Sequence, residues 1–198
     1  MKSIDIKGTA RTATGKKASR EIRKAGAVPC NLYGEAKGEN GLPVALSFTA
    51  TQEELRKLVY TPDIYSVNLN IDGKECKAIM KELQFHPVTD ALLHVDFYEI
   101  TETKPIVMEV PIKLNGLAEG VKAGGKLAAS VRKLKVKAPY TAIPEKLNID
   151  VTNLGLGKTI KVGELNFERL ELVTSPSDEV CQDKMTRSAM SAAAKAQE

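Results

Sequence analysis

The stretch that most limits the possible folds is SVNLNIDGKECKAIM, residues 66–80. Apolar and polar residues alternate along SVNLNI, which is the period of a strand with one buried face. Asp72-Gly73 follows directly, and this dipeptide favours the two-residue type I′ turn of a hairpin. The return strand runs from Lys74 towards Phe85. The sequence therefore predicts an antiparallel β-hairpin.

The rest of the first hundred residues mixes short strands with two short helices. Strands are expected within residues 2–13, 43–48 and 92–100. A first helix follows Gly15 and ends at Gly26, a residue suited to the position after a helix. A second helix is expected over 52–59, because Thr51 and Glu54 form a capping box. This pattern predicts an α+β domain over residues 1–100, built as a small curved sheet or β-barrel with short helices.

The composition changes after Ile100. TETKP, residues 101–105, reads as a polar linker. Beyond it, the stretches VMEVPIKL, VRKLKVKA, LNIDV and TIKVGEL alternate between apolar and polar residues, and Gly- and Pro-rich turns separate them. No convincing helix is expected before about residue 183, so residues 101–185 are predicted to form an all-β C-terminal domain. The Ala-rich end, 186–198, is expected to be a flexible tail.

Bulk composition excludes several classes of protein. The start has no apolar signal region, and no run approaches the roughly 18 apolar residues that a membrane span needs. The three cysteines are widely spaced without a C-x-x-C motif. This favours a reducing compartment, and it disfavours a disulfide framework or a zinc site. The chain is interpreted as cytoplasmic, with no membrane partner.

Positive charge is concentrated near the start of the chain. The whole chain carries a formal charge of +4, but residues 1–37 hold nine Lys/Arg and three Asp/Glu, a local charge of +6. On a helical projection, four cations fall between about 140° and 240° from the apolar stripe, and Ser19 flanks them. These cations are Lys16, Arg20, Arg23 and Lys24. The pattern suits a ridge that binds phosphates, although an ordinary solvated helix face is the alternative.

The strand LLHVDFYEI carries the second candidate surface. Strict alternation places Leu93 with the buried apolar residues, and it places Leu92 beside His94 and Asp96 on the opposite face. His86 could approach this face if the two strands are neighbours.

Three interpretations of that polar face stay open. A His-x-Asp metal or acid/base site is one, but no matching ligand spacing accompanies it. With Lys81 and Gln84 the face also suits base-edge and 2′-OH contacts in the wide, shallow minor groove of RNA. A plain surface pair is the third interpretation. No metal is expected.

The remaining motifs do not indicate catalysis. GVKAGGKL, residues 120–127, has Leu127 where a phosphate-binding loop needs Ser or Thr. NLGLGKTI has Thr152 where the first glycine belongs, and neither stretch precedes a recognisable helix. No nucleophile elbow is present. The chain is expected not to be an enzyme and to need no cofactor or small-molecule substrate.

GKKASREIRKAGAVPCNLYG, residues 15–34, resembles the signature of the bacterial ribosomal proteins that bind 5S rRNA, the twenty-fifth of the large subunit. The hairpin followed by LQFHP and LLHVDFYEI is similar to the end of the same domain. VPIKLNGLAEGVKAGGKL, PEKLNIDV and GKTIKVGEL are similar to the extra β domain of the long form, the general-stress or CTC type. The resemblance covers nearly the whole chain except the tail.

The resemblance implies a domain that grips the loop E region of 5S rRNA across its minor groove, in the central protuberance. By matching position it implies RNA contacts from Arg11, Lys16, Ser19, Arg20, Arg23, Tyr33, His94 and Asp96, with Lys81, Gln84 and His86 as weaker candidates. Three residues depart from the family pattern. Lys17 replaces a small residue, Phe85 stands where a basic residue is common, and Lys81 replaces the glutamine of the short form.

The leading hypothesis is therefore a structural constituent of the large ribosomal subunit, associated with ribosomes through 5S rRNA and neighbouring subunit RNA and proteins. The alternative is a stress-related protein-interaction adaptor with incidental RNA affinity. A third hypothesis, an enzyme that uses His86, His94 and Asp96, finds no support beyond the residue types.

Overall fold

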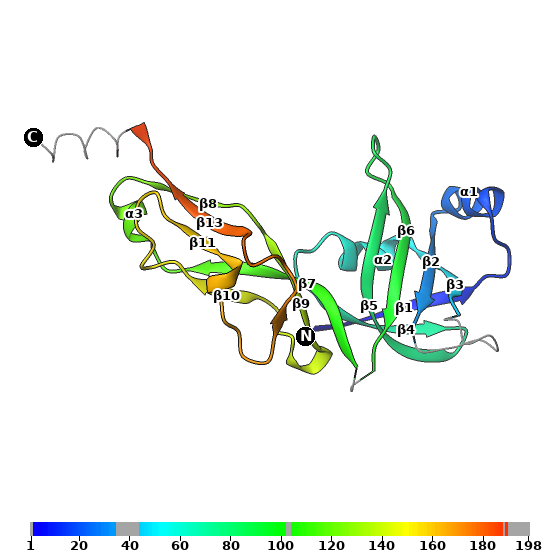
Figure 1. Ribbon diagram of the computed structural model, residues 1–198. Helices are drawn as coiled ribbons and strands as arrows, with labels where there is room; N and C mark the ends of the chain where they lie inside the picture. The colour runs from blue at the N-terminus through cyan, green and yellow to red at the C-terminus, as the bar shows by residue number, and fades with distance from the viewer. Residues whose placement is uncertain (1, 35–43, 102–103, 188, 190–198) are drawn as a thin grey trace, which may run out of the picture. The chain divides into compact units, whose positions relative to one another are not determined.

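The computed structural model describes residues 2–34, 44–101, 104–187 and 189. It divides into two compact units, Met1–Lys104 and Pro105–Glu198, which are treated separately below (Figure 1). The sequence-based α+β class for the first part and all-β class for the second are both confirmed. No helix in the described part of the chain is long and apolar enough to cross a membrane.

Unit 1 is a closed six-stranded barrel with two helices. Its strands are β1 (Lys2–Ala10), β2 (Ala27–Tyr33), β3 (Leu46–Thr51), β4 (Tyr65–Ile71), β5 (Lys74–Phe85) and β6 (Leu92–Glu99), and its helices are α1 (Lys16–Lys24) and α2 (Gln52–Val59). Around the barrel the order is β1-β3-β2-β6-β5-β4. The β1–β4 and β2–β6 pairs are parallel and the others antiparallel.

Local sequence signals account for several of these elements. Asp72 and Gly73 both have positive φ, 48° and 87°, as the type I′ turn between β4 and β5 requires. Thr51 accepts a hydrogen bond from the backbone N–H of Glu54 at the start of α2, so the predicted helix cap is confirmed. Gly26, with φ 79°, follows the end of α1 and turns the chain into β2.

The barrel interior is aliphatic with two central aromatic rings. Phe48 of β3 and Phe97 of β6 are fully buried, and their ring centroids lie 5.8 Å apart. Leu55 and Leu58 of α2 join the same core, so α2 caps the barrel through its apolar stripe. Each buried side chain of this size contributes about 1.5–3 kcal/mol, which makes the barrel a rigid support for its outer face.

Two details of the predicted strands are wrong. The strand expected over 43–48 lies at Leu46–Thr51, and Pro43 falls outside the described residues. Leu92, expected on the outer face with His94, is 5 % exposed and belongs to the core, whereas Leu93 is half-buried. A register shift between Gln84 and Phe85 of the partner strand interrupts the alternation there.

Unit 2 contains a four-stranded sheet in the order β10-β7-β9-β12 and a three-stranded sheet in the order β11-β13-β8. Its strands are β7 (Pro105–Asn115), β8 (Lys126–Ala129), β9 (Lys133–Pro139), β10 (Leu147–Asp150), β11 (Thr159–Lys161), β12 (Glu171–Leu172) and β13 (Glu179–Lys184). The short turns are α3 (Glu119–Lys122), η1 (Tyr140–Ala142) and η2 (Val162–Glu164).

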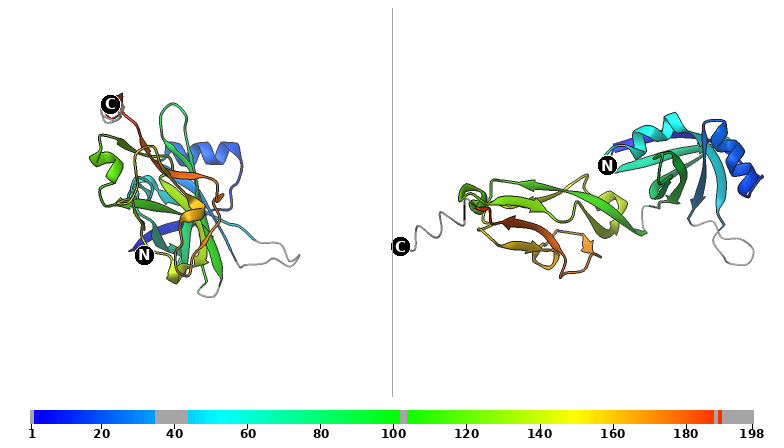
Figure 2. Two further views of the ribbon diagram at one scale, coloured as in Figure 1. Left: turned by 60° about the vertical axis from the view of Figure 1, so that its left-hand side comes forward. Right: turned by 90° about the horizontal axis from the view of Figure 1, so that it is seen from above.

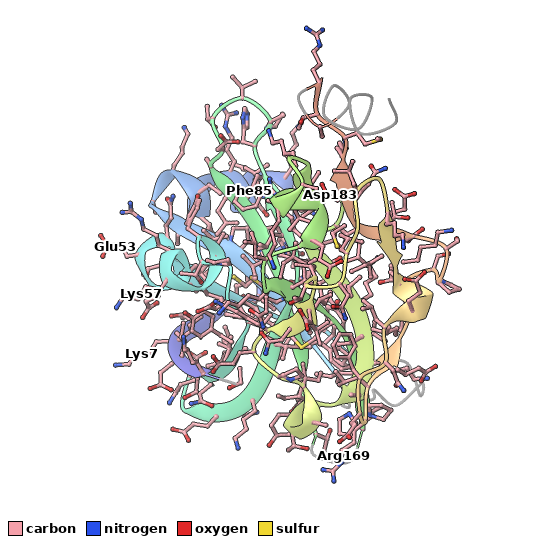
Figure 3. All side chains as sticks on the ribbon, turned by 90° about the vertical axis from the view of Figure 1, so that its left-hand side faces the viewer. Lys7, Glu53, Lys57, Phe85, Arg169 and Asp183 are labelled. Atoms are coloured by element: carbon pink, nitrogen blue, oxygen red, sulfur yellow. The ribbon has the colours of Figure 1, made fainter. Side chains whose placement is uncertain are left out.

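The one-turn helix α3 differs from the expectation of no helix before residue 183. It occupies part of GVKAGGKL, and Gly124, with φ 93°, leads from it towards β8. Asp183 of β13 lies against this turn and is fully buried (Figure 3). Most of the predicted flexible tail, residues 188 and 190–198, lies outside the described part. Ala189 is buried, and its backbone N–H donates to Thr186 Oγ1.

Candidate nucleic-acid interface

Helix α1 presents the predicted cationic ridge on its exposed side. Lys16, Arg20, Arg23 and Lys24 are all exposed, whereas Ser19 and Ile22 are half-buried. The helix lies outside the barrel next to β2, as two further views show (Figure 2). Lys16 and Lys17 occupy the first turn, where the helix dipole is positive and no acidic residue is present. This placement is unfavourable in the free protein, and a bound anion would relieve it.

Arg23 joins the helix to the polar strand. Its Nε donates a hydrogen bond to the carbonyl oxygen of Leu93 at 3.0 Å. This contact holds α1 beside the start of β6, one residue from His94. The loop between β5 and β6 stands at the same end of the barrel as α1 (Figure 1). The two surfaces that the sequence predicted separately therefore lie side by side.

The outer side of the barrel carries a row of polar residues across adjacent strands. Glu82 of β5 is paired with Asp96 of β6. Asp96 is paired in turn with Asn31 of β2, and Asn31 with Ser47 of β3. Ser47 Oγ donates to Asn31 Oδ1 at 3.0 Å. At the far end, the backbone N–H of Arg11 donates to Ser47 O at 2.9 Å. We call Glu82, Asp96, Asn31 and Ser47 the polar row.

His94 sits next to the polar row with Gln84 opposite it. Its Nδ1 lies 3.2 Å from Asp96 Oδ1, which assigns Nδ1 as the donor and leaves Nε2 as an acceptor. Burial lowers the pKa of His94 below its usual value; Arg11 and Arg23 lower it further, and Asp96 and Glu82 oppose them. His94 is therefore a neutral imidazole at pH 7, oriented by Asp96.

Two tyrosines extend this surface. Tyr33 of β2 lies beside Tyr98 of β6, with ring centroids 5.7 Å apart in an edge-to-face arrangement. Partial burial raises the pKa of the Tyr33 hydroxyl, and the carboxylates of Asp96 and Glu82 raise it further. Tyr33 therefore keeps its proton and can donate a hydrogen bond beside the polar row.

The weaker candidates have different surroundings. Lys81 is exposed and lies at a β-bulge between Met80 and Glu82. Gln84 is exposed and belongs to the same face as His94. His86 begins the turn between β5 and β6, where its Nδ1 accepts the backbone N–H groups of Val88 and Thr89 at 3.3 Å each. His86 therefore has a structural role in shaping this turn.

The guanidinium group of Arg11 is partly shielded from solvent. Its Nε and Nη1 are shielded from solvent and have no hydrogen-bond partner among the described residues. Leaving such donors unpaired costs about 1–3 kcal/mol. An acceptor brought to this face by a ligand would therefore be favourable.

Sequence reasoning missed Glu82 and Asn31, whereas the alternation in LLHVDFYEI already placed Tyr98 on the face of His94 and Asp96. Glu82 and Asn31 stand two residues before Gln84 and Tyr33, respectively, so the period of a strand was the available signal. Among the described residues, no group of three or more His, Cys, Asp or Glu side chains could hold a metal ion. The three cysteines are free thiols; Cys30 and Cys181 are buried, and burial raises the pKa of Cys30 to about 12.

Comparison with known proteins accounts for both units. Residues 6–97 match the model of the Ribosomal L25p family. A protein of Phocaeicola vulgatus named Large ribosomal subunit protein bL25 is 66% identical over 196 residues, which cover 99% of each chain. The chain belongs to the ribosomal L25p family.

Other relatives extend this result. Residues 105–187 match the C-terminal domain of ribosomal protein TL5, which agrees with the long form of the L25p family. Proteins with the name Large ribosomal subunit protein bL25 from Bacteroides thetaiotaomicron and Porphyromonas gingivalis are 59% and 52% identical, over 99% and 100% of each chain. The similarity therefore spans both units.

Proposed function

We propose that this L25p-family protein is a structural constituent of the large ribosomal subunit and binds the loop E region of 5S rRNA in the central protuberance. Family membership supports the ribosomal role. The observation that carries the RNA contact is the bond from Arg23 Nε to Leu93 O, since it joins the exposed cations of α1 to the strand that bears His94 and Asp96.

The two surfaces have separate tasks in this proposal. Arg20, Arg23 and Lys16 contact phosphates, where guanidinium groups form bidentate hydrogen bonds and the ammonium group acts as a point charge. The polar row and His94 face the minor groove, whose base edges and 2′-hydroxyls are accessible in RNA. Phosphate contacts provide most of the affinity and set the register, and the strand contacts read the RNA.

Arg20→Ala and Arg23→Ala test this proposal in a binding titration of 5S rRNA against salt, with tRNA as competitor. Each variant is expected to bind more weakly, and each lost phosphate contact is expected to reduce the log–log salt slope by about 0.7–0.9. Lys57→Ala is the matched control, because Lys57 is an exposed cation on α2 (Figure 3). If both arginine variants bind like the wild type, the ridge is not an RNA contact.

Co-sedimentation separates this role from that of a protein-interaction adaptor. A subunit constituent is expected to travel with large subunits in the cell extract and to detach at high salt. An adaptor is expected to remain in the soluble fraction at every salt concentration. We further propose that the two units are separate domains joined near residues 101–105, with 5S rRNA binding confined to the first.

A further inference from the structure

An acidic pair lies in the middle of the cationic surface. Glu82 and Asp96 are directly opposite each other on β5 and β6. Like charges in this position destabilise a sheet, typically by a few tenths of a kcal/mol. They also repel phosphates. A surface that only bound the RNA backbone would gain from neutral residues at both positions.

Hydrogen-bond acceptors are concentrated around Glu82 and Asp96. Asp96 accepts from His94, whose Nε2 is then an acceptor as well. Asn31 Oδ1 is already occupied by Ser47 Oγ. Glu82 is exposed and makes no ion pair among the described residues. Its carboxylate therefore offers two acceptor oxygens beside a neutral imidazole acceptor.

Cations surround this centre. Arg23 is bonded to Leu93 O, next to His94, and Arg11 lies at the other end of the polar row. Arg11 and Arg23 both act electrostatically on His94, as do Asp96 and Glu82, so all four charges lie close to the imidazole. A ligand bound by the cations would thus bring its donors against Glu82.

RNA offers few donors to such a centre. Phosphates have only acceptors. In the minor groove the bases present a single kind of donor, the N2 amino group of guanine, and the ribose adds its 2′-hydroxyl. The hydroxyl is present at every nucleotide, whereas the amino group distinguishes guanine from all other bases. A carboxylate that the sheet holds at a fixed register position is well placed to accept a hydrogen bond from this amino group.

We propose that Glu82 is a specificity-determining residue that accepts a hydrogen bond from the N2 amino group of a guanine in the minor groove of the bound RNA. Asp96 acts beside it as the residue that orients His94. This inference rests on the proposed function, and it adds that the site selects guanine through a carboxylate.

Whether one substitution raises or lowers RNA affinity distinguishes this role from that of a passive surface charge. Glu82→Ala removes a carboxylate from an RNA-binding face. If Glu82 only repels phosphates, RNA affinity rises. If it accepts from guanine, affinity for the 5S rRNA fragment falls by about tenfold or more, as expected for a hydrogen bond to a charged group. The fold is not at risk, because the substitution relieves the repulsion from Asp96; an unchanged thermal midpoint checks this.

The matched control is Glu75→Ala, on the same strand β5 but in register with Asn70, away from the polar row. The RNA arm replaces guanosines of the loop E fragment one at a time by inosine, which lacks only the N2 amino group. One inosine fragment is expected to bind the wild-type protein about tenfold more weakly than the guanosine fragment does. The Glu82→Ala protein is expected to bind these two fragments equally well. A second arm replaces the 2′-hydroxyls by hydrogen.

Three results would overturn the inference. The first is Glu82→Ala binding RNA as tightly as Glu75→Ala or more tightly. The second is additive losses of affinity for Glu82→Ala and every inosine, and the third is coupling to a 2′-deoxy position in place of an inosine. Each leaves the arginine titration unaffected. Conversely, normal binding by Arg20→Ala and Arg23→Ala refutes the proposed interface without reference to Glu82. The two sets of measurements therefore fail independently.

Discussion

Gly120 gives the sharpest test of packing in unit 2. It is buried in α3, and a Cβ atom there would overlap Asp183 Oδ2 and approach Leu156 N to 2.7 Å. Asp183 is fully buried, so its side chain cannot swing into solvent, and the Leu156 contact is with backbone. Gly120→Ala therefore forces main-chain movement.

The expected cost follows from these contacts. Overpacking a closely packed site costs about 1–3 kcal/mol. Because one clash is with an enclosed side chain and the other with backbone, the upper part of this range applies, about 2–3 kcal/mol. Each 1.4 kcal/mol is tenfold in an equilibrium constant, so the open population of unit 2 rises by about 30- to 140-fold.

Cysteine alkylation measures this change in each unit separately. Cys181 of β13 is fully buried, and burial raises the pKa of its thiol, so it reacts only when unit 2 opens. Cys30 reports in the same way on unit 1. Peptide mass spectrometry is expected to show faster labelling of Cys181 in Gly120→Ala and unchanged labelling of Cys30.

Gly155→Ala is the matched control. The nearest atom to its Cβ would be Lys158 Cδ at 3.5 Å, an ordinary contact with a flexible side chain. A glycine replaced without strain gains about 0.4–1 kcal/mol, so labelling of Cys181 is expected to stay the same or slow down. Equal labelling rates for the two variants would show that the space around Asp183 is not closely packed.

Two further predictions concern unit 1. The pKa of His94 is lowered on folding, so the unfolded chain binds a proton at His94 more readily than the folded chain does. The stability that neutral His94 contributes is therefore present above about pH 6.5, and it is lost as the pH falls through the pKa of His94 in the folded protein. Urea midpoints from pH 7 to 5 are expected to fall less steeply for His94→Gln than for the wild type, and parallel profiles would contradict this. Thr51→Ala removes the N-cap contact to Glu54 and is expected to cost about 1 kcal/mol in urea unfolding, whereas Thr51→Ser retains most of it; equal losses would contradict the cap.

Local chemistry explains which elements could be predicted. Asp72-Gly73 needs no distant partner to favour its turn, and Thr51 caps α2 with an atom three residues away. The error at Leu92 has a nonlocal cause, because the register shift beside Gln84 depends on how β5 pairs with β6. Between the pairs Gln84–His94 and Phe85–Leu92 the register skips Leu93, so one extra residue in β6 turns Leu92 towards the core.

The candidate site shows the same division. The cations of α1 and the alternation around His94 are visible in the sequence, since each depends on residues within one helix or one strand. The parallel β2–β6 pairing that sets Asn31 beside Asp96, and the bond from Arg23 to Leu93 O, belong to the tertiary structure. The amino-acid order alone determined the elements and their charged faces. Closure of the barrel around Phe48 and Phe97 decided which faces meet, because burial of apolar side chains from distant segments sets the strand order and register.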